Sequence, residues 1–149
     1  MRKATDYIVI HCSATPAHMD VDAKDIDRWH RAKGWLKIGY HFVVKRDGTL
    51  QKGRDLDQIG AHVQGFNHQS IGICMVGGMD KDNKNPEDNF AAVQYVTLHM
   101  ILDDLVRLYP TARLVGHWEL DPKKACPVLS MDKLRAERTA RLAVKTQLD

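Results

Sequence analysis

Two histidines and one cysteine have the residue types and the positions of a catalytic metal site. His11 lies near the end of an apolar, β-branched run, His117 follows a second strand-like segment, and Cys126 comes after a short loop. Strand ends hold reactive groups rigidly, while the adjoining loops leave room for a substrate. Two imidazoles and one thiolate bind zinc well and leave the fourth tetrahedral position open for water. The three residues therefore predict a catalytic zinc site.

Spacing alone does not distinguish this zinc site from a plainer alternative. The chain has neither the closely spaced ligand pairs of a zinc finger nor the helical His-Glu-x-x-His motif. In the alternative, His11 and His117 are hydrogen-bonded, partly buried histidines, and Cys126 is a small core residue. Both interpretations stay open on the pattern alone.

Strands that would position these residues are predicted from short apolar runs. Buried strands are expected at residues 7–12 and 71–76, and a shorter strand is expected at 113–116. Residues 38–45 and 49–52 flank Arg46-Asp47-Gly48, which is typical of a hairpin turn. The polar stretch 77–88 is predicted to be a surface loop.

Helices are predicted between the strands at residues 21–33 and 91–108, and after the last strand at 132–147. Asp20 or Asp22 would cap the first, and Gly34 would end it. The inner stripe of the second helix is predicted to be Val93, Val96, Met100, Ile101, Leu105 and Leu108. Strands that alternate with helices favour an α/β fold with a single mixed β-sheet flanked by helices.

Length, composition and charge fit one domain spanning residues 1–149. The chain has 149 residues, of which 44% are apolar, and a net charge of +3. A mild positive charge suits an anionic polymer such as cell wall or nucleic acid, and equally a protein with no charged partner. Nothing else supports nucleic-acid binding, so no nucleic-acid partner is expected.

The N-terminal residues and the cysteines indicate where the protein is made. Residues 1–6 lack the apolar core of a signal peptide, and no apolar stretch is long enough to span a membrane. We therefore expect folding in the cytoplasm without membrane insertion. Cys12, Cys74 and Cys126 cannot all pair within one chain, and a reducing compartment would keep them as thiols.

Short motifs along nearly the whole chain share their order and spacing with one protein family. They are residues 10–15, 35–42, 45–49, 67–73, 76–78, 116–117 and 122–127. On these motifs the chain resembles the zinc N-acetylmuramoyl-L-alanine amidases of phages (endolysins), in the amidase type 2 and peptidoglycan recognition protein family. The resemblance implies that family's α/β fold and hydrolysis of the amide bond between N-acetylmuramic acid and L-alanine in peptidoglycan.

The resemblance also assigns roles to five residues. His11, His117 and Cys126 fall on the ligands of one Zn²⁺ ion, and Tyr40 and Lys124 fall on the two catalytic residues beside it. Zinc lowers the pKa of bound water and polarises a carbonyl. Lys124 would stabilise the oxyanion, and Tyr40 would hydrogen-bond the attacking water or pass a proton to the leaving amine. Which of the two side chains handles which step stays open.

Two loops carry further implications of the resemblance. His62, Asn67 and His68 fall on the loop that lines the substrate groove. The loop before Cys126 looks one residue longer than in the phage relatives, so a shifted loop would present Lys123 in place of Lys124. The remaining histidines are expected to be structural: His18, His30 and His99 face solvent or the edge of the core, and His41 points away from Tyr40.

Two other functions compete with the amidase. A non-catalytic peptidoglycan-binding module can share the fold, but such modules typically lack the zinc-binding cysteine, and Cys126 is present. Some phage relatives also bind and restrain the phage RNA polymerase, so this polymerase is a second candidate partner beside peptidoglycan. An endolysin of this kind accumulates in the host cytoplasm and is released to the cell wall at lysis.

Overall fold

A mixed five-stranded sheet forms the centre of the molecule. The computed structural model describes residues 1–148. The strand order is β4-β3-β5-β1-β7, with β3 and β4 antiparallel and the other neighbours parallel. The strands are β1 (Tyr7–Cys12), β3 (Phe42–Val44), β4 (Leu50–Lys52), β5 (Ser70–Met75) and β7 (Arg113–Gly116). The predicted α/β class, with a central mixed sheet flanked by helices, is confirmed.

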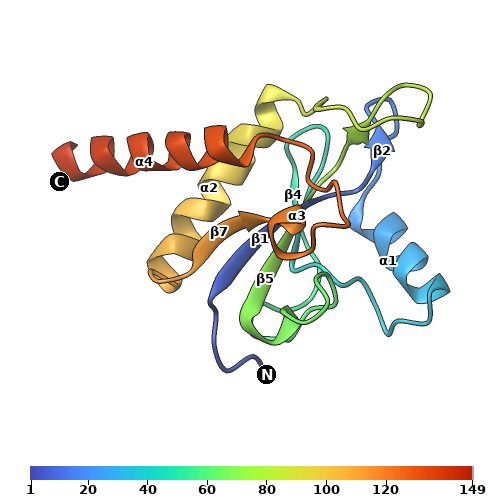
Figure 1. The fold of residues 1–149 in the computed structure, drawn as a ribbon, viewed down its shortest axis with the longest axis horizontal. Helices are drawn as coiled ribbons and strands as arrows, with labels where there is room; N and C mark the ends of the chain where they lie inside the picture. Colours follow the sequence, from blue (N-terminus) through green and yellow to red (C-terminus); the bar gives the residue numbers. More distant parts are fainter. Residues whose placement is uncertain (149) are drawn as a thin grey trace.

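Among the described residues, four α-helices surround this sheet, and a short 3-10 helix (Asn67–Gln69) precedes β5 (Figure 1). The α-helices are α1 (Ala23–Ala32), α2 (Ala92–Leu108), α3 (His117–Leu120) and α4 (Met131–Leu148). Of the two caps predicted for α1, Asp22 is the N-cap. Its carboxylate accepts the Asp25 N–H at 2.9 Å, and the Asp25 carboxylate accepts the Asp22 N–H at 3.0 Å. This capping box fixes where α1 begins.

A small second sheet and the short helix α3 were not predicted. In the second sheet, β2 (Thr15–Pro16) and β6 (Gly78–Met79) pair in parallel. Two-residue strands and a four-residue helix are too short to leave a periodic pattern in the sequence. The predicted loop at residues 77–88 therefore contains one short strand.

The central sheet has two different faces. Alternate residues of β1 and β5, including Ile8, Ile10 and Ile73, pack against α2 and α4 in the largest core cluster. The residues between them, including Val9, His11 and Gly72, lie on the opposite face. Smaller clusters around Val9 and Val43 cover that face only in part. The partly covered face is the one that holds the candidate site.

The inward face of α2 differs from the predicted one. Ile101 and Leu105 of the predicted stripe are buried, as expected. The other four members, Val93, Val96, Met100 and Leu108, are largely exposed, and Gln94, Leu98 and Leu102 are buried in their place. α2 has apolar residues on two sides, so periodicity allows two inner stripes. Gln94 favours one of them, because its Nε2 donates to the Val44 and Val76 carbonyls at 3.2 and 2.9 Å.

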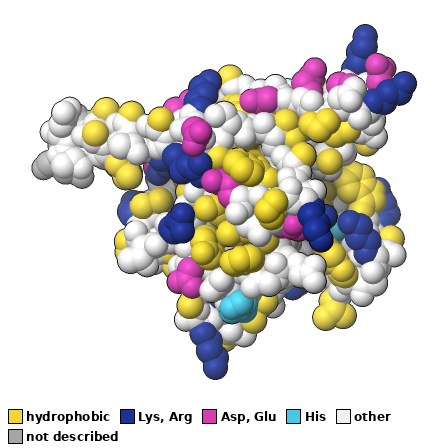
Figure 2. Space-filling model, viewed as in Figure 1, with side chains coloured by type: hydrophobic (Ala, Val, Ile, Leu, Met, Phe, Trp, Pro, Cys, Tyr) yellow, Lys and Arg dark blue, Asp and Glu magenta, His cyan; other side chains and the backbone are white. Residues whose placement is uncertain are grey.

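On its visible face the described part of the molecule shows no concentration of one charge, and its helices are not of the membrane-spanning kind. Figure 2 shows positive and negative side chains interspersed over the visible face, rather than one extended area of a single sign. In the part of the chain that the structure describes, no helix combines the length and the apolar character needed to cross a bilayer.

Candidate metal centre and cleft

Strand register brings the two predicted histidine ligands together. β1 and β7 run parallel, with Ile10 opposite Gly116, so the residues that follow, His11 and His117, lie side by side. Their ring centroids are 4.5 Å apart. His117 is also the first residue of α3, where the chain turns away from the sheet. Two segments far apart in sequence thus present adjacent imidazoles.

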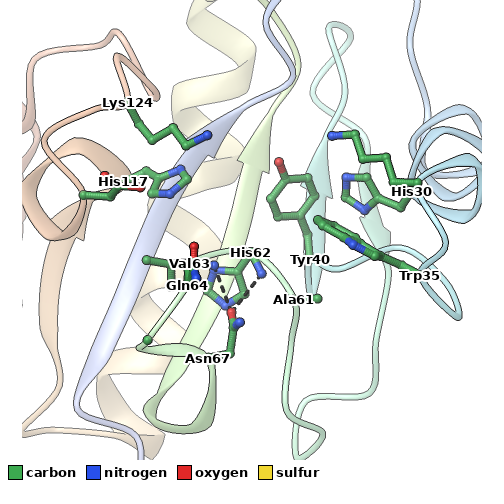
Figure 3. A pocket seen from close by; sticks show the side chains of 13 residues that line it. His30, Trp35, Tyr40, Ala61, His62, Val63, Gln64, Asn67, His117 and Lys124 are labelled. Carbon is green, nitrogen blue, oxygen red and sulfur yellow. Dashed lines mark hydrogen bonds between the residues drawn. The ribbon is translucent and has the colours of Figure 1, made fainter.

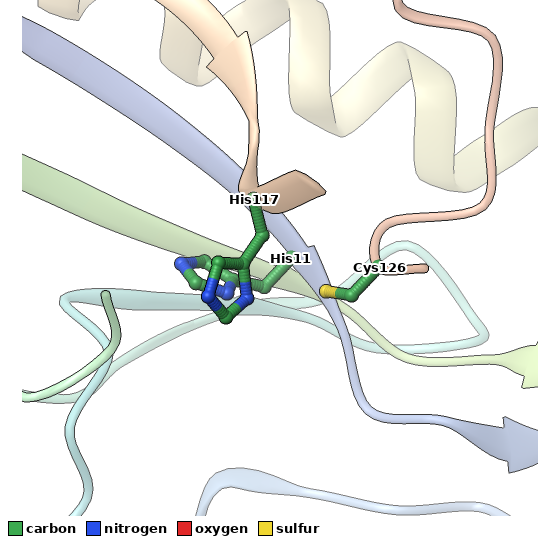
Figure 4. A group of neighbouring side chains, drawn as sticks. All are labelled: His11, His117 and Cys126. Atoms are coloured by element: carbon green, nitrogen blue, oxygen red, sulfur yellow. The ribbon is translucent and has the colours of Figure 1, made fainter. Parts of the chain in front are cut away.

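Cys126 joins these imidazoles from the loop between α3 and α4 (Figure 4). The loop is held by the Trp118 N–H, which donates to the Cys126 carbonyl at 3.0 Å. The Cys12 N–H at the end of β1 donates to the Cys126 Sγ at 2.9 Å. One ligand atom from each of His11, His117 and Cys126 lies within 4.8 Å of the others.

The electrostatics of these groups suit a cation. Burial and the neighbouring His62 and His117 imidazoles hold the pKa of His11 well below its usual value. Burial and the Lys124 ammonium lower the pKa of His117. Both rings are therefore neutral at neutral pH and have a lone pair to offer. Contact with the Cys12 thiol and burial raise the pKa of Cys126, so a cation is needed to hold it as a thiolate.

A cleft of about 550 Å³ opens beside this centre (Figure 3). Lys124 and His117 lie on one side, Tyr40 and Trp35 lie across from them, and His62 lies between. The full lining is His30, Lys33, Trp35, Tyr40, Ala61, His62, Val63, Gln64, Gly65, Asn67, His117, Asp121 and Lys124. The cleft has the size of a ligand pocket and is open to solvent.

Tyr40 stands in the cleft wall next to the metal centre. Its ring centroid is 5.0 Å from that of His11. Burial raises the pKa of Tyr40 well above its usual value, so the phenol keeps its proton. The hydroxyl is therefore a hydrogen-bond donor throughout the neutral range.

The structure separates the two adjacent lysines that the sequence left as alternatives. Lys124 lines the main cleft and lies near enough to lower the pKa of His117. Lys123 lines only an adjoining pocket of about 420 Å³, which Lys124 also borders, and is not among the residues that line the main cleft. The Lys123 N–H donates to the Asp121 carboxylate at 3.2 Å, which fixes the turn.

The three residues predicted to line the substrate groove lie in different surroundings. His62 is only 8% exposed, and its Nδ1 lies 2.8 Å from His11 Nε2. Asn67 lines the cleft, and its Oδ1 accepts the N–H groups of His62 and Val63 at 2.8 and 2.9 Å. His68 is exposed and is not among the residues that line the described cleft. Contact of these three side chains with substrate stays a prediction.

Trp35 and His30 are cleft residues that were not predicted to belong to the site, and His30 was expected to face solvent or the edge of the core. His30 is buried in the cleft wall, and its Nδ1 accepts the Gly39 N–H at 2.9 Å. Burial lowers the pKa of His30 to about 4, so its proton stays on Nε2. Its ring centroid lies 4.5 Å from that of Trp35. The available signal was helical spacing, because Ile26 and His30 are four residues apart and share the inner face of α1.

Comparisons with known proteins agree on one family. A family described as N-acetylmuramoyl-L-alanine amidase matches residues 1–128. The endolysin of Enterobacteria phage K11 is 45% identical over 141 residues, which cover 95% of this chain and 91% of that protein. The N-acetylmuramoyl-L-alanine amidase LysC from Clostridium intestinale URNW has a TM-score of 0.78 at 25% identity, covering 89% of this chain and 84% of that one.

A further solved structure is that of a protein that binds peptidoglycan. Peptidoglycan recognition protein-LE, in complex with tracheal cytotoxin (monomeric diaminopimelic acid-type peptidoglycan), has a TM-score of 0.67 at 28% identity. The match covers 83% of this chain and 74% of that one.

Proposed function

Because the chain belongs to the N-acetylmuramoyl-L-alanine amidase family, we propose that it cleaves peptidoglycan with one zinc ion held by His11, His117 and Cys126. The bond cut is the amide between N-acetylmuramic acid and L-alanine. With phage endolysins among the relatives, the biological role is lysis of the host cell wall.

The observation that carries the zinc part of this proposal is the convergence of the three ligands. Neutral imidazoles and a thiol that accepts a backbone N–H form a typical set of zinc ligands. Three protein ligands leave one coordination position free, as in catalytic rather than structural zinc sites. When bound, zinc supplies a Lewis acid for the carbonyl and a water of lowered pKa.

The side chains of the cleft would handle the remaining charge and protons. The Lys124 ammonium, on the same side as His117, is placed to stabilise the negative charge on the carbonyl oxygen. The protonated Tyr40 hydroxyl faces it across the cleft and donates a hydrogen bond to the water or to the leaving amine. His30 and Trp35 would hold the sugar or the peptide beside these groups.

Peptidoglycan as the substrate is supported by the relatives. The phage K11 relative is an endolysin, and a structural neighbour binds a peptidoglycan monomer. We infer that the enzyme meets its substrate in the cell wall after release from the cell in which it is made. Restraint of an RNA polymerase stays a prediction from resemblance and forms no part of this proposal.

The decisive experiment incubates the purified protein with purified peptidoglycan, with and without a zinc chelator, and identifies the products by mass spectrometry. We expect free stem peptides that begin with L-alanine, released by the untreated protein and lost with chelator. Restoring zinc should restore release.

Two other results would lead elsewhere. Binding of peptidoglycan without release of peptides would indicate a recognition module. Fragments cut within the glycan would contradict the amidase chemistry itself, and release that survives complete removal of metal would contradict the zinc assignment.

A further inference from the structure

His62 lies directly behind the candidate metal centre and is held there by close packing. Its ring sits over Gly72 of β5, where an added Cβ would lie 2.7 Å from the ring. A Cβ on Gly60 would lie 2.6 Å from the same ring. Two glycines thus make the space that this imidazole fills.

Hydrogen bonds fix both ring nitrogens of His62. Nδ1 lies 2.8 Å from His11 Nε2, and Nε2 lies 3.3 Å from the Ser70 hydroxyl. The backbone N–H of His62 in turn donates to the Asn67 Oδ1 at 2.8 Å. Since neither nitrogen is free, the structure points to a role for His62 toward His11 rather than toward substrate.

The bond between His11 and His62 holds one proton, and its position decides whether His11 can bind a metal. If His11 Nε2 carries the proton and donates it to His62 Nδ1, then His11 Nδ1 keeps its lone pair. If His62 donates instead, the proton of neutral His11 moves to Nδ1 and blocks that lone pair. The first arrangement leaves His62 with its proton on Nε2, where the Ser70 oxygen accepts it.

We propose that His62 is a positioning residue for the metal centre, which fixes the ring and the tautomer of His11 by accepting its Nε2 proton. Partners of this kind orient metal-binding histidines and typically change metal affinity about 10–100-fold. The inference rests on the proposed zinc binding and adds to it the His11–His62–Ser70 chain of hydrogen bonds.

The test measures zinc affinity of the metal-free protein by competition with a coloured chelator. His62→Leu keeps a similar volume but removes the acceptor, so the zinc Kd should rise about 10–100-fold. His62→Asn places an amide oxygen close to the Nδ1 position, so its Kd should stay within about threefold of wild type, as expected when the acceptor is kept. The Co²⁺ absorption spectrum should change in His62→Leu and be preserved in His62→Asn.

The matched control is His41→Asn. His41 is a second buried histidine, with its ring centroid 5.8 Å from that of His62, and it bonds to Gly72 and Gln58 instead of to His11. This variant should lose stability but bind zinc as wild type does. A fall in zinc affinity equal to that of His62→Leu would mean that general loosening explains both, and would overturn the inference.

Other outcomes also decide. If His62→Leu binds zinc as tightly as wild type, the proposed role of the acceptor is wrong. The same holds if His62→Asn binds zinc as weakly as His62→Leu. Should His62→Leu fail to fold, His62→Gln replaces it, because its longer side chain carries the oxygen away from His11. If the wild-type protein releases peptides with zinc but every His62 variant binds zinc normally, only this inference is wrong. If the wild-type protein binds no zinc, the proposed function is wrong as well.

Discussion

Beyond its proposed role as a zinc ligand, Cys126 links the candidate metal centre to the end of β1. Its Sγ accepts the Cys12 N–H, and its carbonyl accepts the Trp118 N–H. Replacement by serine keeps the size and the carbonyl contact but loses the thiolate, which zinc prefers to a hydroxyl.

We expect Cys126→Ser to bind zinc far more weakly and to release no detectable peptide from peptidoglycan. Loss of a direct ligand should exceed the about 10–100-fold effect of losing an outer partner. The far-ultraviolet circular dichroism spectrum should stay close to that of wild type. Zinc bound at a full equivalent by this variant would exclude Cys126 as a ligand.

The two adjacent lysines make a second prediction for single residues. Lys124→Ala should lower kcat by about 10²–10³, the usual effect of losing one oxyanion donor, while zinc content stays unchanged. Lys123→Ala, which changes only the adjoining pocket, is the matched control and should stay within about threefold of wild type if its side chain donates nothing to the oxyanion. Steady-state rates of peptide release decide between them, and the reverse order would show that the loop presents Lys123.

At the scale of secondary-structure elements, Gln94 connects α2 to the sheet. Its amide donates to carbonyls of β3 and of the segment after β5, and its oxygen accepts from the Ala91 N–H and from Arg46. All of these contacts are made by a side chain with no exposure to solvent.

Gln94→Leu should lower the free energy of unfolding by at least about 2 kcal/mol, because several buried polar groups lose their partner at once. Val96→Gln is the control. Val96 is 60% exposed, so this change should stay within about 0.5 kcal/mol of wild type. Urea denaturation measures both; a larger effect at Val96 than at Gln94 would mean that the predicted stripe of α2 was the correct one.

His41 makes the junction of β3 and β5 sensitive to acid. Its Nδ1 accepts the Gly72 N–H at 3.0 Å, and its Nε2 bonds to the Gln58 carbonyl at 2.8 Å. Burial lowers the pKa of His41 to about 4, below the value near 6.5 in an unfolded chain. The unfolded chain therefore binds more protons between these values, so this stabilisation is complete above pH 6.5 and is lost as the pH falls toward 4.

Between pH 7 and pH 5 the buried His41 should cost about 2 kcal/mol of stability. Wild type contains other buried histidines, so the contribution of His41 is measured as a difference. His41→Asn should be less stable than wild type at pH 7, and the gap should narrow by about 2 kcal/mol at pH 5. Urea unfolding of both proteins in the presence of a chelator tests this. A gap independent of pH would show that the pKa of His41 is the same in the folded and unfolded states.

At the scale of the whole molecule, one face of the sheet forms most of the core and the other forms the candidate site. One face packs against α2 and α4 and supplies most of the core, and the other holds the candidate metal centre and the cleft. α4 is joined to α2 by Asp103, which pairs with Arg138 at 2.9 Å and with Arg141 at 2.8 Å. Beyond Arg141, the described side chains of α4 from 142 to 147 are exposed.

A chain shortened after Leu142 should therefore keep its activity on peptidoglycan and lose less than about 1 kcal/mol of stability, as exposed residues contribute little. A chain shortened further, to end before Arg138, should be strongly destabilised. It lacks the buried Arg138 guanidinium and leaves Asp103 without Arg138 and Arg141. Thermal unfolding and peptide release measure both changes. Loss of activity in the chain that ends after Leu142 would show that the far part of α4 reaches the substrate.

How much of the molecule the sequence predicts depends on how far each feature relies on local pattern. β1 is predicted at its observed bounds because a central parallel strand is apolar on both faces. The pairing of His11 with His117 follows from register, which spacing along the chain does not contain. Their expected place at strand ends was correct. Residue type and placement also grouped Cys126 with them, but only the family resemblance favoured a zinc site over separate buried residues.

Features formed by long-range contacts were predicted least well. The inner face of α2 depends on Gln94, a polar residue that a search for apolar stripes passes over. His30 was expected to face solvent or the edge of the core, and the ring of Trp35 and the N–H of Gly39 place it in the cleft wall instead. Such partners come from other segments, so helical spacing alone shows only that His30 shares a face with Ile26.

The course of α4 has a consequence for protein engineering. This helix runs away from the body, and its far end lies on the other side of the molecule from α1, which carries His30 of the cleft wall (Figure 1). A second protein domain could be fused through a continuous helix grown from α4 without covering the cleft. Each residue inserted at the junction would move that domain outward by about 1.5 Å and rotate it by about 100°, so both its distance from the enzyme and its orientation could be set by counting residues.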